Sequence, residues 1–169
     1  MKKIIFLLSL IVAVGNQLKA QSTCGTCSVN ITSTDTLNYT IGTGQTFCVA
    51  KNGNYTGNII LNGGTICVNG FFNPKTITVN SGTLNNYGTM SINASIVLGS
   101  GLTLTNNSGA IININGSINL NSATLTNNGI LNVDQTLSNL GSVTNTSIIN
   151  CTTLSGSGTL NDTGIINSN

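Results

Sequence analysis

The stretch "TLTNNGILNV", residues Thr124–Val133, decides the fold although it contains no acid, no base and no aromatic ring. Similar phrases begin at Thr83, Thr103, Ser142 and Thr159. Within each phrase apolar and polar residues alternate with a period of two, which is typical of β-strands and not of helices. The chain therefore repeats a short strand-forming unit.

Aligning the phrases produces one apolar column, with gaps of 17–21 residues between its members. Repeats of this length are typical of solenoids in which each repeat forms one coil. Each repeat contains three short apolar segments separated by polar corners. The sequence thus predicts an all-β fold, a three-sided parallel β-helix (β-solenoid) of about seven coils of 17–21 residues. The column consists of Phe47, Ile66, Leu84, Leu104, Leu125, Val143 and Leu160.

Polar residues recur two positions after the column, and small residues follow them. Asparagine and glycine tolerate the left-handed backbone of a sharp corner, and stacked amides can hydrogen-bond along a rod. We interpret these asparagines as structural, although a ligand-binding row is the alternative. The polar residues are Asn86, Asn106, Asn127, Asn145 and Asp162, and the small ones are Gly88, Gly129, Ser147 and Gly164.

The N-terminus predicts export. Two lysines precede an apolar run that ends before Ala20, so residues 1–20 match a secretory signal. The run is too short to span a bilayer, and we expect a secreted protein, extracellular or at the cell surface, and not an integral membrane protein. Residues 21–41 form a cysteine-containing segment, a candidate cap for the first coil, and residues 42–169 form the solenoid.

Composition argues against most chemistry. Beyond the signal, two lysines face three aspartates, a net charge of −1, and the chain has no His, Glu or Arg. Nucleic-acid binding needs a row of cations, and catalysis needs titratable groups brought together. Asp134 and Asp162 are out of register with the repeat. We therefore expect no catalytic, cofactor-binding or metal-binding residues, and a β-helix enzyme acting on polysaccharides is the least favoured alternative.

The cysteines predict disulfides. Cys48 and Cys67 each follow a column residue and lie one repeat apart, and in-register neighbours on adjacent strands are within disulfide range. A Cys48–Cys67 staple is preferred, and pairing of these residues with Cys24 or Cys27 is the alternative. Cys151, which matches Val133 and Ile92 in the repeat, is expected to be a small buried hydrophobe.

The segments "GQTFCVAKNGNYTGNIILNGGTICVNGFFNP" and "GTLNNYGTMSI" resemble the N-terminal repeat region of large surface proteins of Bacteroidetes. These are often adhesins exported by the type IX pathway. The resemblance implies a surface location, and Asp35-Thr36-Leu37 looks like the O-glycosylation signal of that phylum, with Thr36 as acceptor. Such proteins usually carry a C-terminal sorting domain. The sequence here ends within a repeat, and an uncapped coil exposes unpaired backbone groups, so we expect either a longer protein beyond Asn169 or a last coil that docks on a partner, another copy included.

The expected function is a secreted, non-catalytic structural or adhesin-type module of the cell surface, with glycans or other surface components as partners. The alternative is a module that binds an ordered surface, ice or a crystalline glycan, through a flat threonine ladder. Stiff β-branched side chains repeated at strand spacing suit such contact. The ladder residues are Thr83, Thr103, Thr105, Thr124, Thr126, Thr144 and Thr159.

Overall fold

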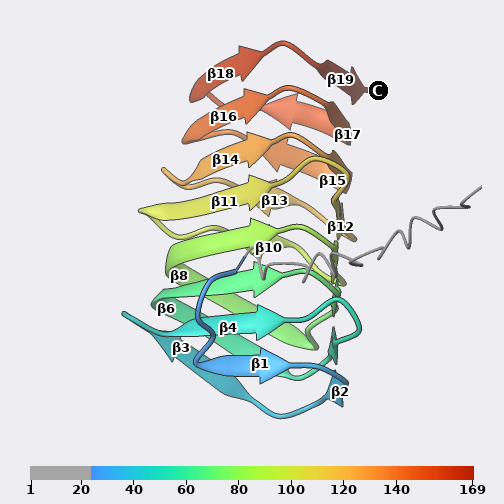
Figure 1. The fold of residues 1–169 in the computed structure, drawn as a ribbon. Coiled ribbons are helices and arrows are strands. Elements are labelled where there is room, and N and C mark those ends of the chain that lie inside the picture. Colours follow the sequence, from blue (N-terminus) through green and yellow to red (C-terminus); the bar gives the residue numbers. More distant parts are fainter. Residues whose placement is uncertain (1–23) are drawn as a thin grey trace, which may run out of the picture.

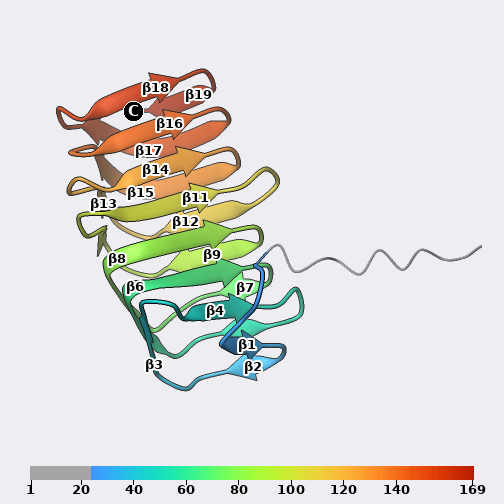
Figure 2. The same ribbon diagram turned by 60° about the vertical axis from the view of Figure 1, so that its left-hand side comes forward.

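A computed structural model describes residues 24–169, so the expected signal segment lies outside the described residues. The described chain is all β-strand and winds into a stack of parallel coils (Figure 1). The view turned by 60° shows the strands one above another along the rod (Figure 2). Within these residues no helix is long and apolar enough to cross a membrane. The predicted parallel β-solenoid is confirmed.

One side of the rod, face A, contains the strands that carry the apolar column. Its strands pair in parallel in the order β1-β4-β6-β8-β11-β14-β16-β18. β6 and β8 are long because each turns a corner and belongs to two sides of the rod. The strands are β1 (Val29–Ile31), β4 (Thr46–Val49), β6 (Asn58–Val68), β8 (Thr76–Asn86), β11 (Leu102–Asn106), β14 (Thr124–Asn127), β16 (Ser142–Asn145) and β18 (Thr159–Asp162).

A second side, face B, follows face A in every coil. Its strands also pair in parallel, each with its equivalent one coil away. β15 and β17 continue past a corner onto the third side, with a register shift between Val133 and Thr136. The strands are β2 (Thr34–Asp35), β5 (Asn54–Tyr55), β7 (Phe71–Phe72), β9 (Thr89–Ile92), β12 (Ile111–Ile114), β15 (Ile130–Ser138), β17 (Ile148–Ser155) and β19 (Ile165–Ser168).

The third side, face C, closes each coil. It is formed by the first parts of β6 and β8, the last parts of β15 and β17, and three short strands. No single coil buries its apolar side alone, and stacking supplies the core. The short strands are β3 (Tyr39–Gly42), β10 (Ile96–Val97) and β13 (Ile118–Asn119).

The predicted apolar column is in register over its whole length, from Phe47 to Leu160. Val29 pairs with Phe47 and extends the column by one coil. The first coil is therefore formed by β1, β2 and β3, which occupy the candidate cap segment 21–41 and extend one residue beyond it, to Gly42. The Asn38 side chain also joins this coil to the next one, since it accepts a hydrogen bond from the Asn58 amide at 2.9 Å.

The core changes composition along the rod. In the first coils the rings of Tyr39, Phe47, Tyr55 and Phe72 pack together, with centroids 4.9–6.0 Å apart in the adjacent pairs. Farther along, the core is mainly aliphatic, and Leu125 and Leu131 are completely buried. Aromatic rings bury more apolar area per residue than aliphatic side chains, so they concentrate stabilisation at the N-terminal end.

The corner glycines were correctly placed, but the reason expected for them was wrong. The left-handed backbone occurs mainly at the corner before face A, for example at Gly101 with φ of 78°, and after face A it occurs at Gly109. At the corner after face A the glycine is needed for close approach. A Cβ atom added to Gly129 or Gly164 would collide with the carbonyl oxygen of Ala110 or Ser147 in the preceding coil. Glycine avoids this collision in these two coils, whereas Ala110 and Ser147 occupy the equivalent position in the preceding coils.

Candidate functional site

The predicted threonine ladder forms two outward columns on face A. Thr103 pairs with Thr124, and Thr105 pairs with Thr126. The first column also includes Thr46 and Thr65, which were not predicted from the sequence. They pair in register with each other and then with Thr83. The predicted ladder residues are exposed or half-buried, and from Thr83 onward Asn85, Ser142 and Asn161 replace threonine at three positions.

The hydroxyls of the ladder remain available to an external partner. Within residues 24–169, no side-chain hydrogen bond involves the ladder hydroxyls. The asparagine side chains at the ends of the same strands, in contrast, are hydrogen-bonded to one another. Rows of unpartnered hydroxyls at a strand spacing of about 4.8 Å can form repeated weak hydrogen bonds with a regular surface. The same arrangement also suits a plain solvated sheet, since threonine favours strands.

The two disulfides cross from the N-terminal segment to face A, and the preferred Cys48–Cys67 staple is wrong. Cys24 bonds Cys67 and Cys27 bonds Cys48, with Cα atoms 5.5 and 5.8 Å apart. Cys48 and Cys67 are in register, as expected. However, their side chains point side by side out of the sheet, whereas a disulfide requires side chains that approach each other. Residues from the facing N-terminal segment meet that requirement.

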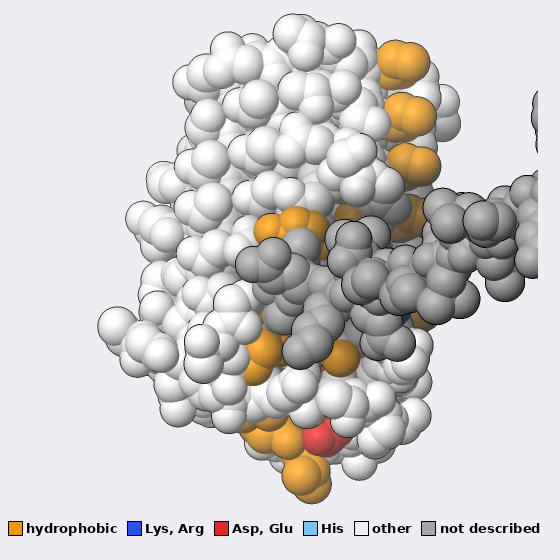
Figure 3. All heavy atoms as spheres, in the orientation of Figure 1, with side chains coloured by type: hydrophobic (Ala, Val, Ile, Leu, Met, Phe, Trp, Pro, Cys, Tyr) orange, Lys and Arg blue, Asp and Glu red, His pale blue; other side chains and the backbone are white. Residues whose placement is uncertain are grey.

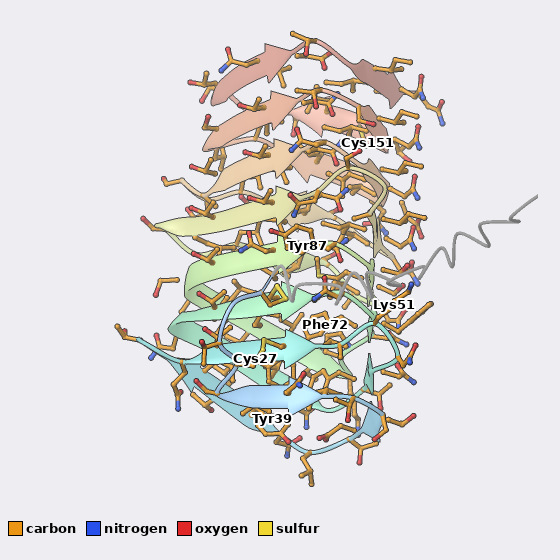
Figure 4. All side chains as sticks on the ribbon, viewed as in Figure 1. Cys27, Tyr39, Lys51, Phe72, Tyr87 and Cys151 are labelled. Carbon is orange, nitrogen blue, oxygen red and sulfur yellow. A yellow bond between two sulfur atoms is a disulfide. The ribbon has the colours of Figure 1, made fainter. Side chains whose placement is uncertain are left out.

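The segment from Cys24 to Ser28, which we call the strap, therefore covers part of face A. Cys48 and Cys67 are 2% and 1% exposed although they lie outside the hydrophobic core cluster. The strap is bonded first to β6 and then to β4 before it enters β1, and Figure 4 labels Cys27 beside β4. The strap therefore covers the second outward column at Cys48 and Cys67, whereas Thr46 and Thr65 in the first column stay half-buried.

A buried amide ladder follows face A, as predicted. Asn86 donates to Asn106 at 2.9 Å, and Asn106 donates to Asn127 at 2.8 Å. The series continues through Asn145 to the carboxylate of Asp162, again at 2.8 Å. All four asparagines are completely buried. This burial supports the structural interpretation over a ligand-binding row.

A second ladder lies on the outside of face B and was missed from the sequence. Asn132 donates to Asn113 at 2.8 Å, Asn150 donates to Asn132 at 2.8 Å, and Asn167 donates to Asn150 at 2.7 Å. The sequence does contain a signal for this ladder, because an isoleucine stands two residues before each of its asparagines. These outward isoleucines are Ile111, Ile130, Ile148 and Ile165.

The titratable groups are dispersed. Asp35 accepts a hydrogen bond from Tyr39 at 3.0 Å in the first coil, and burial followed by this bond raises the pKa of Tyr39. Asp134 and Asp162 lie on different faces of different coils. Among residues 24–169 no group of three or more His, Cys, Asp or Glu side chains could hold a metal ion. This arrangement offers no obvious acid–base pair.

Two other predicted residues occupy defined places. Cys151 is buried, unpaired and in register with Val133, the position expected for it. Burial raises the pKa of its thiol, so it behaves as a small hydrophobe. Thr36 is exposed in the turn between β2 and β3, where a modifying enzyme could reach it, and its glycosylation stays a prediction.

Comparison of the chain with family models, curated proteins and solved structures gives no match in any of the three. The fold defines its class as a parallel β-solenoid, and the outer faces of the rod carry its candidate functional surfaces.

Proposed function

We propose that the chain is an exported, non-catalytic rod of adhesin type that forms part of the cell surface. The observation that carries the proposal is the uninterrupted stack of coils, from β1 to β19, whose interior is filled by apolar side chains and self-paired amides. Such a rod provides length and repeated outer faces, which suit display and contact. The two disulfides are compatible with an extracellular location, and the resemblance to Bacteroidetes surface proteins agrees with it.

Localisation on intact cells tests this proposal. An epitope tag is inserted beside Leu140, which is 48% exposed between β15 and β16, and the cells of origin are stained before and after permeabilisation. We expect staining of intact cells and loss of the tag after external protease treatment. Staining that requires permeabilisation would contradict a surface role.

A second candidate function is binding of an ordered surface through the threonine ladder. The in-register columns of face A favour it. Replacing Thr103, Thr105, Thr124 and Thr126 with lysine should then abolish ice recrystallisation inhibition or retention on crystalline cellulose. If the parent is active and the folded variant matches it, the ladder has no part in binding.

A further inference from the structure

The outer surface of face B contains a hollow beside the second amide ladder. Its volume is about 570 Å³, within the usual range of ligand sites. The amide ladder forms one wall, and the buried Val133 and Cys151 contribute to the lining. The other polar lining residues are Asp134, Thr152 and Asn169.

The amides of this wall are held in place and keep part of their hydrogen-bonding capacity. Asn132 uses one N–H toward Asn113 and accepts one bond from Asn150, whereas an asparagine side chain offers two N–H donors and two lone pairs. A donor and an acceptor therefore recur at about 4.8 Å intervals along the rod. Because neighbouring coils already fix these side chains, binding a ligand orders them at little further entropic cost.

Apolar side chains flank the same wall on its other side. Ile111, Ile130 and Ile148 are half-buried, and Ile165 is 56% exposed. Figure 3 shows a row of apolar side chains along this side of the rod. An apolar row therefore runs parallel to a row of amides, about 6.6–6.8 Å away as expected for alternate residues of a strand.

The charge of the hollow determines which classes of polymer can bind there. Asp134 is the only ionisable side chain among its polar lining residues, and within the described chain it has no ion-pair partner. A carboxylate accepts hydrogen bonds from hydroxyl groups and repels anions. Nucleic acids and acidic polysaccharides are disfavoured, whereas an uncharged, hydroxyl-rich chain is compatible.

The size and backbone pairing of the surface argue against protein partners. Four rungs at about 4.8 Å and two columns about 7 Å apart give a strip on the order of 200 Å², far below the roughly 800 Å² per partner of a stable interface. Strand addition requires an unpaired edge. β15 is paired on both sides, and of the strands at the hollow only β19, at the end of the stack, pairs on one side, so an added strand would lie beyond the hollow and not along its wall. A narrow polymer fits better than a second copy or an extended peptide.

We propose that this hollow binds a single chain of a neutral polysaccharide lying along the rod axis. The C–H surfaces of successive sugar rings contact the isoleucine row, and their hydroxyls pair with the amides and with Asp134. The inference rests on the proposed surface role and specifies its ligand class and its contact face.

Retention on insoluble cellulose, chitin and mannan tests the proposal, with cross-linked alginate as the anionic comparison. Purified residues 21–169 should be retained by at least one of the three neutral polymers and not by alginate. The double variant Asn132→Arg/Asn150→Arg fills the hollow with bulk and charge and should weaken retention at least tenfold. The matched control Thr136→Arg/Thr153→Arg places the same two charges in register on face C of the same coils and should bind like the parent.

Each contrary result overturns the inference. It fails if the parent binds none of the neutral polymers, if it prefers alginate, or if both double variants bind equally well with unchanged circular dichroism. Loss through Thr126→Arg/Thr144→Arg alone would assign binding to face A instead. If the hollow variant unfolds, NMR of the parent replaces it. Chemical-shift changes of the parent's amides are then measured on addition of a hexasaccharide of the retained polymer. The inference requires these changes to cluster at Asn113, Asn132 and Asn150, and changes elsewhere overturn it. None of these outcomes affects surface staining, so the proposed surface role can stand without the hollow.

Discussion

Asn127 donates a side-chain hydrogen bond of 2.8 Å to Asn145, the residue that occupies the same position one coil later. Asn127 also donates to the carbonyl oxygen of Ile148 at 2.9 Å and accepts from Asn106. One buried side chain therefore joins three successive coils. Burying an amide is favourable only when its polar atoms are paired, so the ladder specifies the register in which the coils stack.

Replacement of Asn127 tests this role. Asn127→Ala removes the links to both neighbouring coils and leaves buried polar groups without partners, each costing about 1–3 kcal/mol. We expect the free energy of unfolding to fall by about 3 kcal/mol, measured by urea denaturation. The matched control is Asn132→Ala in the same coil, which also removes 2.8 Å amide bonds, but at the surface, where water replaces them. A loss as large for Asn132 as for Asn127 would contradict the argument from burial.

The strap is expected to stabilise the first coils through its two disulfides. The loops they close span 43 and 21 residues, for which chain entropy gives about 4 and about 3 kcal/mol. The variants Cys24→Ser/Cys67→Ser and Cys27→Ser/Cys48→Ser should each unfold at lower urea concentration than the parent. Non-reducing peptide mapping should recover a peptide linking Cys24 with Cys67. Recovery of Cys48 linked to Cys67 would restore the pairing first expected from the sequence.

The free thiol of Cys151 should be inert in the folded protein. Burial raises its pKa, so at a given pH less of the reactive thiolate is present than in an exposed cysteine. With Ellman's reagent at pH 8 and without reductant, we expect no rapid labelling of the native protein and one thiol per chain in guanidinium chloride. Cys151→Val copies the residue one coil earlier and should change stability by less than about 1.5 kcal/mol. Rapid labelling of the native protein would show that the thiol is accessible.

The sequence predicted those features of the fold that depend on residues repeated once in every coil. The column from Phe47 to Leu160 and the buried amides follow from residues that recur every coil, and both are found in register. Val29 was missed because the segment around it lacks the repeated phrase. The disulfide pairing was wrong because it depends on where the strap lies, and no periodicity within residues 24–28 specifies the face that they cross.

The outer surfaces were predicted less completely for a related reason. Alternation separates inward from outward residues but does not indicate which outward columns flank a hollow. The hollow on face B lies where β15 turns its corner after Val133, and corner geometry depends on the register shift there. The threonines of face A were prominent in the sequence, whereas the Ile–Asn pairs of face B were read only as parts of strands.

Alkaline pH should destabilise the first coils through Tyr55. Its hydroxyl is 2.7 Å from the carbonyl oxygen of Asn58 and 3.0 Å from that of Leu37. Burial, followed by the charges of Asp35 and Tyr39, raises the pKa of Tyr55 above its ordinary value of 10.0. A phenolate would face two carbonyl oxygens without a proton to donate, so the folded state retains the proton that the unfolded state releases. The resulting stability is fully present below about pH 10 and decreases as the pH rises above that value.

Urea midpoints measured from pH 9 to pH 11.5 test this linkage, since the midpoint of the parent should fall steeply above pH 10. Tyr55→Phe loses the two hydroxyl contacts and starts from a lower midpoint, but its decline with pH should be shallower because the phenol is gone. Tyr87→Phe provides the matched control, since Tyr87 is 37% exposed and its replacement should leave the slope of the parent unchanged. Parallel curves for the parent and Tyr55→Phe would show that the buried phenol does not govern the alkaline transition.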